Sequence, residues 1–174
     1  MKSRISARVA SVTRQLPRPE PPLVFDQNGV ARLSGWRFKA PTDHAAAGSR
    51  SIENDRPILQ IQAQNGAASS GAWRTVVLLE EGHYEFRGFG RATGVSASAT
   101  NTGVILRVSG ERSPKGLCTN ENWTGLRYEF DVQGIVSTEL VAEFRGAQGA
   151  GAFDTAALRL VKKGAASEGK TAHP

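Results

Sequence analysis

The sequence predicts an all-β fold, an antiparallel β-sandwich of jelly-roll type with about eight or nine strands. Apolar residues recur with a period of two, and Gly, Ser and Asn separate the apolar runs. No segment shows the period of an amphipathic helix. An immunoglobulin-type sandwich is the nearest alternative, but a chain with a single cysteine lacks the Cys–Trp–Cys frame of such domains.

The clearest strand signals lie in the first half of the chain. Residues 58–64 (ILQIQAQ) alternate apolar side chains with glutamines, as a half-buried strand does. The apolar run at 73–79 (WRTVVLL) is followed by a short EEG turn and by residues 83–88 (HYEFRG), so these two runs predict a hairpin. Alternation in the second run places Tyr84 and Phe86 in the core. We expect further strands within residues 23–26, 35–38, 103–110, 125–134, 137–146 and 151–163.

The composition predicts one folded module, residues 23–163, between two tails. Residues 1–22 are basic and end in LPRPEPP, which is typical of an extended linker. A transit peptide or a polybasic anchor is the alternative for this segment. Arginines interrupt it, so it holds no apolar run long enough for a signal peptide or a membrane span. The small, polar residues at 164–174 predict a disordered tail.

The net charge of +6 comes from the two ends of the chain. Residues 1–20 carry a net charge of +4, and residues 159–174 carry +3. Residues 21–158 hold 13 Lys and Arg against 14 Asp and Glu, which gives a net charge of −1. Because binding to a phosphate backbone depends on clustered cations, this neutral body argues against a nucleic-acid partner.

The sequence shows no catalytic constellation. Cys118 is the only cysteine, which excludes an intrachain disulfide, and the three histidines are far apart and form no zinc motif. There is no G-x-S-x-G elbow, and GFGRATG precedes no helix that could bind a phosphate. Glu80 and Glu81 are neighbours in a turn, where carboxylates usually point into water. The sequence therefore predicts a protein that is not an enzyme.

Three blocks of sequence, in this order, resemble a known family. They are WRTVVLLEEGHYEFRGFGRA at 73–92, WTGLRYEFDV at 123–132 and GAGAFDTAALRL at 149–160. Together they resemble the carbohydrate-binding-module jelly rolls with a galactose-binding-like fold that are attached to bacterial polysaccharide-degrading and cell-surface proteins. The resemblance implies a non-catalytic accessory module that binds a glycan or polysaccharide, forms part of a larger protein and lies outside the cytoplasm or at the cell surface. The alternative is a structural or protein-interaction sandwich of a larger cell-surface or signalling protein, with no sugar site.

A sugar-binding module is expected to offer an exposed aromatic ring beside hydrogen-bonding side chains. Trp36, Trp73 and Trp123 are the candidate platforms, and packing in the core is the alternative for each indole. Trp123 is the strongest candidate because it follows the polar loop CTNEN, which supplies Asn120 and Asn122. A polar face of the predicted strands completes the ligand-binding set, with a plain solvated face as the alternative. We place on it Gln60, Gln62, Glu85, Arg87 and Arg107.

The resemblance also implies a structural calcium ion. Asp154 matches the aspartate of the family's closing FD motif, and Asp26 occupies the position of an early acidic ligand. Calcium takes about six to eight oxygen ligands, so two carboxylates alone do not form a site. The alternative for Asp154 is that its side chain caps a turn.

Overall fold

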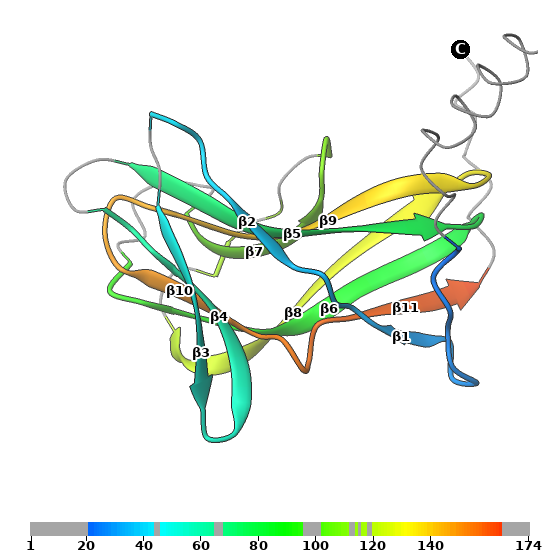
Figure 1. Ribbon diagram of the computed structural model, residues 1–174, viewed down its shortest axis with the longest axis horizontal. Coiled ribbons are helices and arrows are strands. Elements are labelled where there is room, and N and C mark those ends of the chain that lie inside the picture. The colour runs from blue at the N-terminus through cyan, green and yellow to red at the C-terminus, as the bar shows by residue number, and fades with distance from the viewer. Residues whose placement is uncertain are drawn as a thin grey trace, which may run out of the picture.

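The chain forms two antiparallel sheets that pack face to face, which confirms the predicted all-β sandwich (Figure 1). The computed structural model describes residues 21–43, 46–64, 68–95, 102–111, 114, 116–117 and 120–164, apart from the side chain of Asn120. This part of the chain contains eleven strands and no helix. The strands are β1 (Val30–Arg32), β2 (Arg37–Lys39), β3 (Ala47–Glu53), β4 (Arg56–Gln62), β5 (Ser69–Leu79), β6 (Gly82–Thr93), β7 (Gly103–Val108), β8 (Asn120–Val132), β9 (Val136–Gly146), β10 (Ala150–Asp154) and β11 (Arg159–Gly164).

The larger sheet has seven strands, and β6 is the strand that joins its parts. The order is β1-β11-β6-β10-β4-β3, and β8 pairs with β6 as well. The first half of β6 pairs with β11, the second half pairs with β10, and β8 runs along the opposite edge. The smaller sheet has the order β2-β5-β9-β7 and forms the upper layer in Figure 1.

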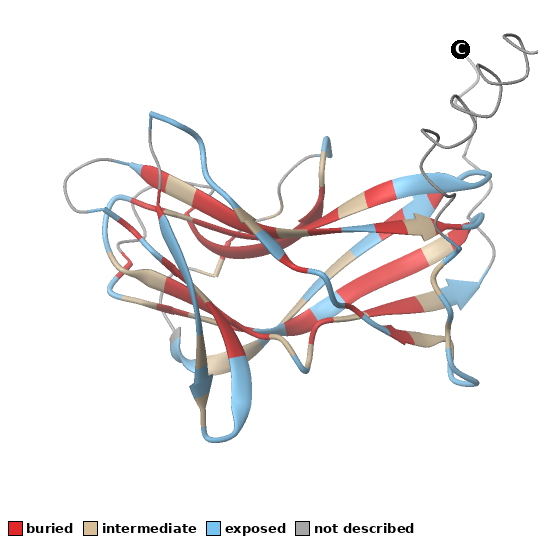
Figure 2. Cartoon of the chain, in the orientation of Figure 1, coloured by how far each residue is buried: buried red, intermediate tan, exposed pale blue. Residues whose placement is uncertain are grey.

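The core between the two sheets follows from the period of two. Tyr84 and Phe86 on β6 are fully buried, as the alternation predicts. Gly88 continues the inner side of β6, where an added Cβ would lie 2.6 Å from Leu158 Cδ2. The glycine therefore lets Leu158 pack directly on the backbone of β6. Figure 2 shows buried residues along the strands of both layers, whereas β3 and most connections are exposed.

The predicted hairpin between residues 73–79 and 83–88 is wrong. These runs belong to β5 and β6, which lie in different sheets: β5 pairs with β2 and β9, not with β6. Both runs have an apolar side, and each side is buried when the two strands face each other across the core. The connection therefore crosses from one layer to the other instead of closing a hairpin. The glycine that the EEG turn was expected to hold in a left-handed conformation, Gly82, has no positive φ and is the first residue of β6, where a Cβ would lie 3.1 Å from the carbonyl oxygen of Gly164.

Strand number and boundaries also differ from the sequence prediction. Residues 23–26 form no strand, and the first strand is instead β1. β3 was not predicted because it is an edge strand with no buried residue, so its sequence shows no apolar alternation. The expected strand at 151–163 is divided into β10 and β11 by a turn after Asp154. Residues 1–20, Cys118 and residues 165–174 lie outside the described residues, so the predicted domain boundaries stay a prediction.

A tight turn between β3 and β4 places the first residue of the candidate site. Asn54 and Asp55 have φ values of 49° and 62°, a left-handed conformation that Asn and Asp tolerate better than most residues. Two such residues in succession form the connection typical of a two-residue hairpin, which is closed by the pair Glu53 and Arg56. The turn thus fixes the register of β3 against β4, and with it the position of Glu53 on the larger sheet.

In the described residues, no helix is long and apolar enough to span a membrane.

Substitutions at two glycines with positive φ allow the cost of backbone strain to be measured apart from the cost of steric overlap. At Gly149 (φ 86°) an added Cβ would lie 2.3 Å from the carbonyl oxygen of Thr93, whereas at Gly134 (φ 69°) no atom lies within 4 Å. We expect Gly134→Ala to lower the free energy of unfolding by about 1 kcal/mol, through left-handed strain alone. Gly149→Ala should cost clearly more, because backbone atoms must also move. Urea denaturation of the two variants measures the difference, and equal losses would contradict this account.

Candidate functional site

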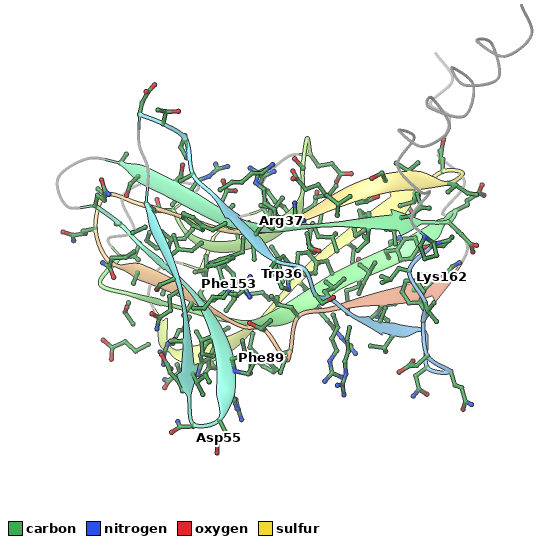
Figure 3. The ribbon with its side chains drawn as sticks, viewed as in Figure 1. Trp36, Arg37, Asp55, Phe89, Phe153 and Lys162 are labelled. Carbon is green, nitrogen blue, oxygen red and sulfur yellow. The ribbon has the colours of Figure 1, made fainter. Side chains whose placement is uncertain are left out.

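Two of the three indoles are buried. Trp36 is only 3% exposed and stacks on Phe86, with ring centroids 6.2 Å apart. Trp73 is 5% exposed, and its Nε1 donates a hydrogen bond to the carbonyl oxygen of Gln60. Figure 3 shows Trp36 between the two sheets. The expectation that Trp36 is a ligand-binding platform is therefore wrong, because its ring fills the core and presents no face to solvent.

Trp123 lies partly exposed on the outer side of the larger sheet. The register of β8 against β6 places it there: Gly90, on the inner side of β6, pairs with Thr124, so the next residue, Trp123, points outward beside Arg91. The pairing becomes irregular only beyond Gly90, before Ala92 pairs with Asn120. The Arg91 guanidinium carbon lies 4.7 Å from the centroid of the Trp123 ring, within the range of a cation–π contact.

Arg91 also forms an ion pair with Glu53 at the end of the β3–β4 hairpin. Its Nη2 donates to both carboxylate oxygens of Glu53, at 2.7 and 2.6 Å. The amide of Gln60 donates to the same carboxylate at 3.1 Å. A connected group of an indole, a guanidinium, a carboxylate and an amide results, and we call Trp123, Arg91, Glu53 and Gln60 the tryptophan cluster. These contacts hold its polar members in place before any ligand arrives.

The outer face of the larger sheet is hollowed around this cluster. One depression of about 260 Å³ is lined by Glu53, Arg91 and Trp123. A second, of about 230 Å³, is lined by Gln60, Gln62 and Arg91. Because Arg91 lines both, the depressions are adjacent. Gln62 is itself exposed, and its amide donates to the carbonyl oxygen of Gly149 at 3.0 Å.

Four of the five residues expected on one polar face do share it. Gln60 and Gln62 on β4 and Glu85 and Arg87 on β6 all point away from the core on the larger sheet. Their role in binding stays a prediction. Asn122 is exposed near Trp123, and the side chain of Asn120 lies outside the described part of the chain. Glu53 and Arg91 were missed, although continuing the alternation of β6 beyond Gly88 would have placed Arg91 on this face.

The expectation that Arg107 shares this surface is wrong. Arg107 lies on β7 in the smaller sheet, and both it and its neighbour Glu143 are buried. Its Nε donates to Glu143 at 2.7 Å, and Arg145 donates to the same carboxylate oxygen at 3.0 Å. Buried charges require such partners, so Arg107 has a structural role in the outer layer of the smaller sheet.

The two candidate calcium ligands act as turn caps. Asp26 Oδ1 accepts the N–H groups of Asn28 and Val30, both at 2.9 Å. Asp154 Oδ1 accepts the N–H of Ala156 at 3.0 Å, which is the alternative that the sequence left open. Among the described residues there is no group of three Asp, Glu, His or Cys side chains that could hold a metal ion. Calcium binding therefore rests on the resemblance and stays a prediction, to be tested by whether a chelator lowers the melting temperature.

Comparison with solved structures finds modules of similar fold. The chain is similar to a CBM4 structure (11% identity over 83% of this chain and 96% of that one, TM-score 0.48). It is similar to TmCBM61 in complex with beta-1,4-galactotriose (13%, 80% and 98%, 0.44) and to the CBM22-1 xylan-binding domain from Paenibacillus barcinonensis Xyn10C (13%, 82% and 91%, 0.43). No family model and no curated protein matches the chain. At these identities the similarity concerns the fold alone.

The ion pairs of the smaller sheet predict how stability depends on pH. Burial raises the pKa of Glu139, but hydrogen bonds from Ser109 and Arg74, together with the charges of Arg74 and Lys39, outweigh it and lower the pKa. A carboxylate with a lowered pKa in the folded state stabilises the protein above its ordinary pKa and loses that contribution as the pH falls. Between pH 6 and pH 3 we expect the melting temperature of Glu139→Gln to fall less than that of the original protein. Parallel curves would show that Glu139 is not linked to folding.

Proposed function

We propose that this chain is a non-catalytic carbohydrate-binding module that binds a glycan on the outer face of its larger sheet. The observation that carries the proposal is the tryptophan cluster: a partly exposed indole in contact with a guanidinium that is itself fixed by a carboxylate. A sugar ring has apolar C–H faces and a rim of hydroxyl groups. It would stack on the exposed part of Trp123 while its hydroxyls bond to Arg91, Glu53 and Gln60.

The donors and acceptors of the cluster suit hydroxyl groups. The Glu53 carboxylate accepts hydrogen bonds, the Arg91 guanidinium donates them, and the Gln60 amide does both. A hydroxyl group also both donates and accepts, so it can bridge a carboxylate and a guanidinium. Because the side chains are already held by one another, little rotamer freedom is lost on binding.

The smaller sheet supports the proposal by contrast. Two arginines on its outer side are engaged in ion pairs, with Arg74 2.6 Å from Glu139 and Arg107 2.7 Å from Glu143. The larger sheet combines a partly exposed aromatic ring with depressions lined by polar groups, so it is the better candidate for the binding face.

The proposal includes the wider setting that the sequence resemblance implies. The module would be an accessory part of, or be associated with, a larger protein, and it would lie outside the cytoplasm or at the cell surface. Its contribution would be to bring that protein to a polysaccharide, and it would perform no chemistry itself. A structural or protein-interaction sandwich without a sugar site is the competing function, and it is an outcome of the following test.

Binding to a polysaccharide panel tests the proposal. We expect the protein to be retarded in native gels that contain at least one polysaccharide, from a panel with galactan, xylan, β-glucan and acidic glycans. Trp123→Ala should weaken binding at least about tenfold, or about 1.4 kcal/mol, because the stacking surface is lost. Arg91→Lys should also weaken it, since lysine keeps the charge but lacks the planar guanidinium that lies over the Trp123 ring.

The matched control is Val76→Ala, which removes an exposed apolar side chain from the smaller sheet. It should bind like the original protein, and the melting temperatures of all variants show whether each one is folded. If no polysaccharide retards the folded protein, the sugar-binding proposal fails and the interaction module is favoured. If Val76→Ala loses binding while Trp123→Ala keeps it, the binding face is the wrong one.

A further inference from the structure

A row of four arginines crosses the outer face of the larger sheet. Arg32 on β1 pairs with Arg159 on β11, Arg159 pairs with Arg87 on β6, and Arg87 pairs with Arg127 on β8. Directly paired residues point to the same side of a sheet, and strands are about 4.8 Å apart. The row therefore spans about 14 Å across four neighbouring strands. The adjacent row, which contains Leu160 and Phe86, faces the core.

The row has few counter-charges. Glu85 lies 3.7 Å from Arg87 and 3.3 Å from Lys163, and its side chain is nearly buried. In the described part of the chain, Arg32, Arg127 and Arg159 form no ion pair, and the buried Nε of Arg159 has no hydrogen-bond partner. Glu129 on β8, which pairs with Glu85, is a second carboxylate near the row, and it is exposed. The local charge is thus strongly positive, although residues 21–158 carry a net charge of −1.

Like charges at directly paired positions destabilise a sheet. Four arginines in one row are therefore not explained by folding, since ordinary alternation needs only polar residues there. Cations that lack partners in the free protein provide donors for an anionic ligand. Arginine is also the side chain best suited to carboxylate and sulfate groups, because its planar fork donates two parallel hydrogen bonds.

An exposed aromatic ring lies next to the row. Phe89 follows Arg87 on the same face of β6 and is 48% exposed. It pairs with Gly125, where an added Cβ would lie 3.9 Å from the Phe89 ring, so the glycine leaves the ring uncovered on that side. Figure 3 shows Phe89 on the outer side of the larger sheet. A depression of about 770 Å³ is lined by Phe89 together with Arg87, Arg127, Arg159, Lys163 and Glu85.

The outer face of β6 connects this depression with the tryptophan cluster. Arg87, Phe89 and Arg91 are alternate residues of β6, so they form one strip on the same face. Arg91 belongs to the cluster and lies about 14 Å along the strand from Arg87. A chain of several sugar units could therefore contact both sites.

We propose that the ligand of this surface is an acidic polysaccharide, whose carboxylate or sulfate groups bind the arginine row while a sugar ring packs on Phe89. This inference rests on the proposed carbohydrate-binding function and narrows its substrate class. The combination of a cationic row and an aromatic ring favours a charged sugar over a neutral one. The row is also short and confined to one face, whereas a nucleic-acid-binding domain would carry a wider basic surface.

The test compares Arg127→Gln/Arg159→Gln with the control Arg37→Gln/Lys39→Gln in the full chain. Both variants lose two cations, but Arg37 and Lys39 lie on β2 of the smaller sheet. The probes are polygalacturonate for carboxylates, dextran sulfate for sulfates, neutral galactan and xylan, and single-stranded DNA. We expect the arginine variant to lose at least about tenfold in affinity for one or both acidic polysaccharides, while the control keeps its affinity. Binding of the acidic probe should also weaken as salt is raised.

Each other outcome overturns a defined part of the inference. If both variants bind the acidic polysaccharides as tightly as the original protein does, the affinity comes from the basic ends of the chain and not from the arginine row. Binding to neutral polysaccharides alone would overturn the acidic ligand but leave the proposed function standing, whereas no binding to any polysaccharide would remove the function itself. Tighter binding to DNA with the same loss in the arginine variant would indicate a nucleic-acid surface. Because like charges are removed, we expect the arginine variant to melt at the same or a higher temperature than the original protein at low salt. Measuring this melting temperature distinguishes a loss of binding from unfolding.

Discussion

The pairing of β6 along both of its edges is the constraint on which both faces of the larger sheet depend. It bonds to β8 on one edge and to β10 and β11 on the other. Because side chains alternate with a period of two, this register sends Tyr84 and Phe86 into the core and Arg87, Phe89 and Arg91 outward. A slip of one residue would exchange the two sets. Burial of the aromatic side chains therefore also fixes the position of the candidate binding strip.

The two outer faces of the sandwich differ in how their arginines are paired with carboxylates. On the smaller sheet, Arg107 and Arg74 contact carboxylates on β9, and the ion pair of Arg107 with Glu143 is almost completely buried. On the larger sheet, Arg127 and Arg159 stand in a row with other arginines and make no ion pair within the described residues. Paired charges stabilise a layer, whereas unpaired like charges reduce its stability and remain available to a ligand. This difference is the physical basis for proposing that an anionic ligand binds the larger sheet.

The tryptophan cluster and the arginine row contribute different properties to that face. The cluster is preorganised, since Arg91 is held by Glu53 and by the indole of Trp123, and it suits the hydroxyl groups of a sugar. The row supplies charge and therefore selectivity for an anionic ligand. Local arrangements that do not favour folding are expected at functional sites, where the rest of the structure compensates for them. Here the compensation comes from the continuous apolar core beneath the same strands.

The sequence by itself determined the fold class and the face of each well-patterned strand, because a period of two is a local property. It correctly placed Tyr84 and Phe86 inside and Gln60, Gln62, Glu85 and Arg87 outside. The same period occurs in both sheets, so the sequence could not show that β5 and β6 lie in different layers or that Arg107 belongs to the smaller one.

Only the tertiary structure decided which side chains meet. Trp36 and Trp123 are the same residue type, yet one fills the core and the other lies on the outer side of the larger sheet beside Arg91. Glu53 and Arg91 are 38 residues apart, and the four arginines of the row come from four separate strands. Such contacts depend on pairing between distant segments, and the burial of the whole core selects that pairing, which no local pattern records.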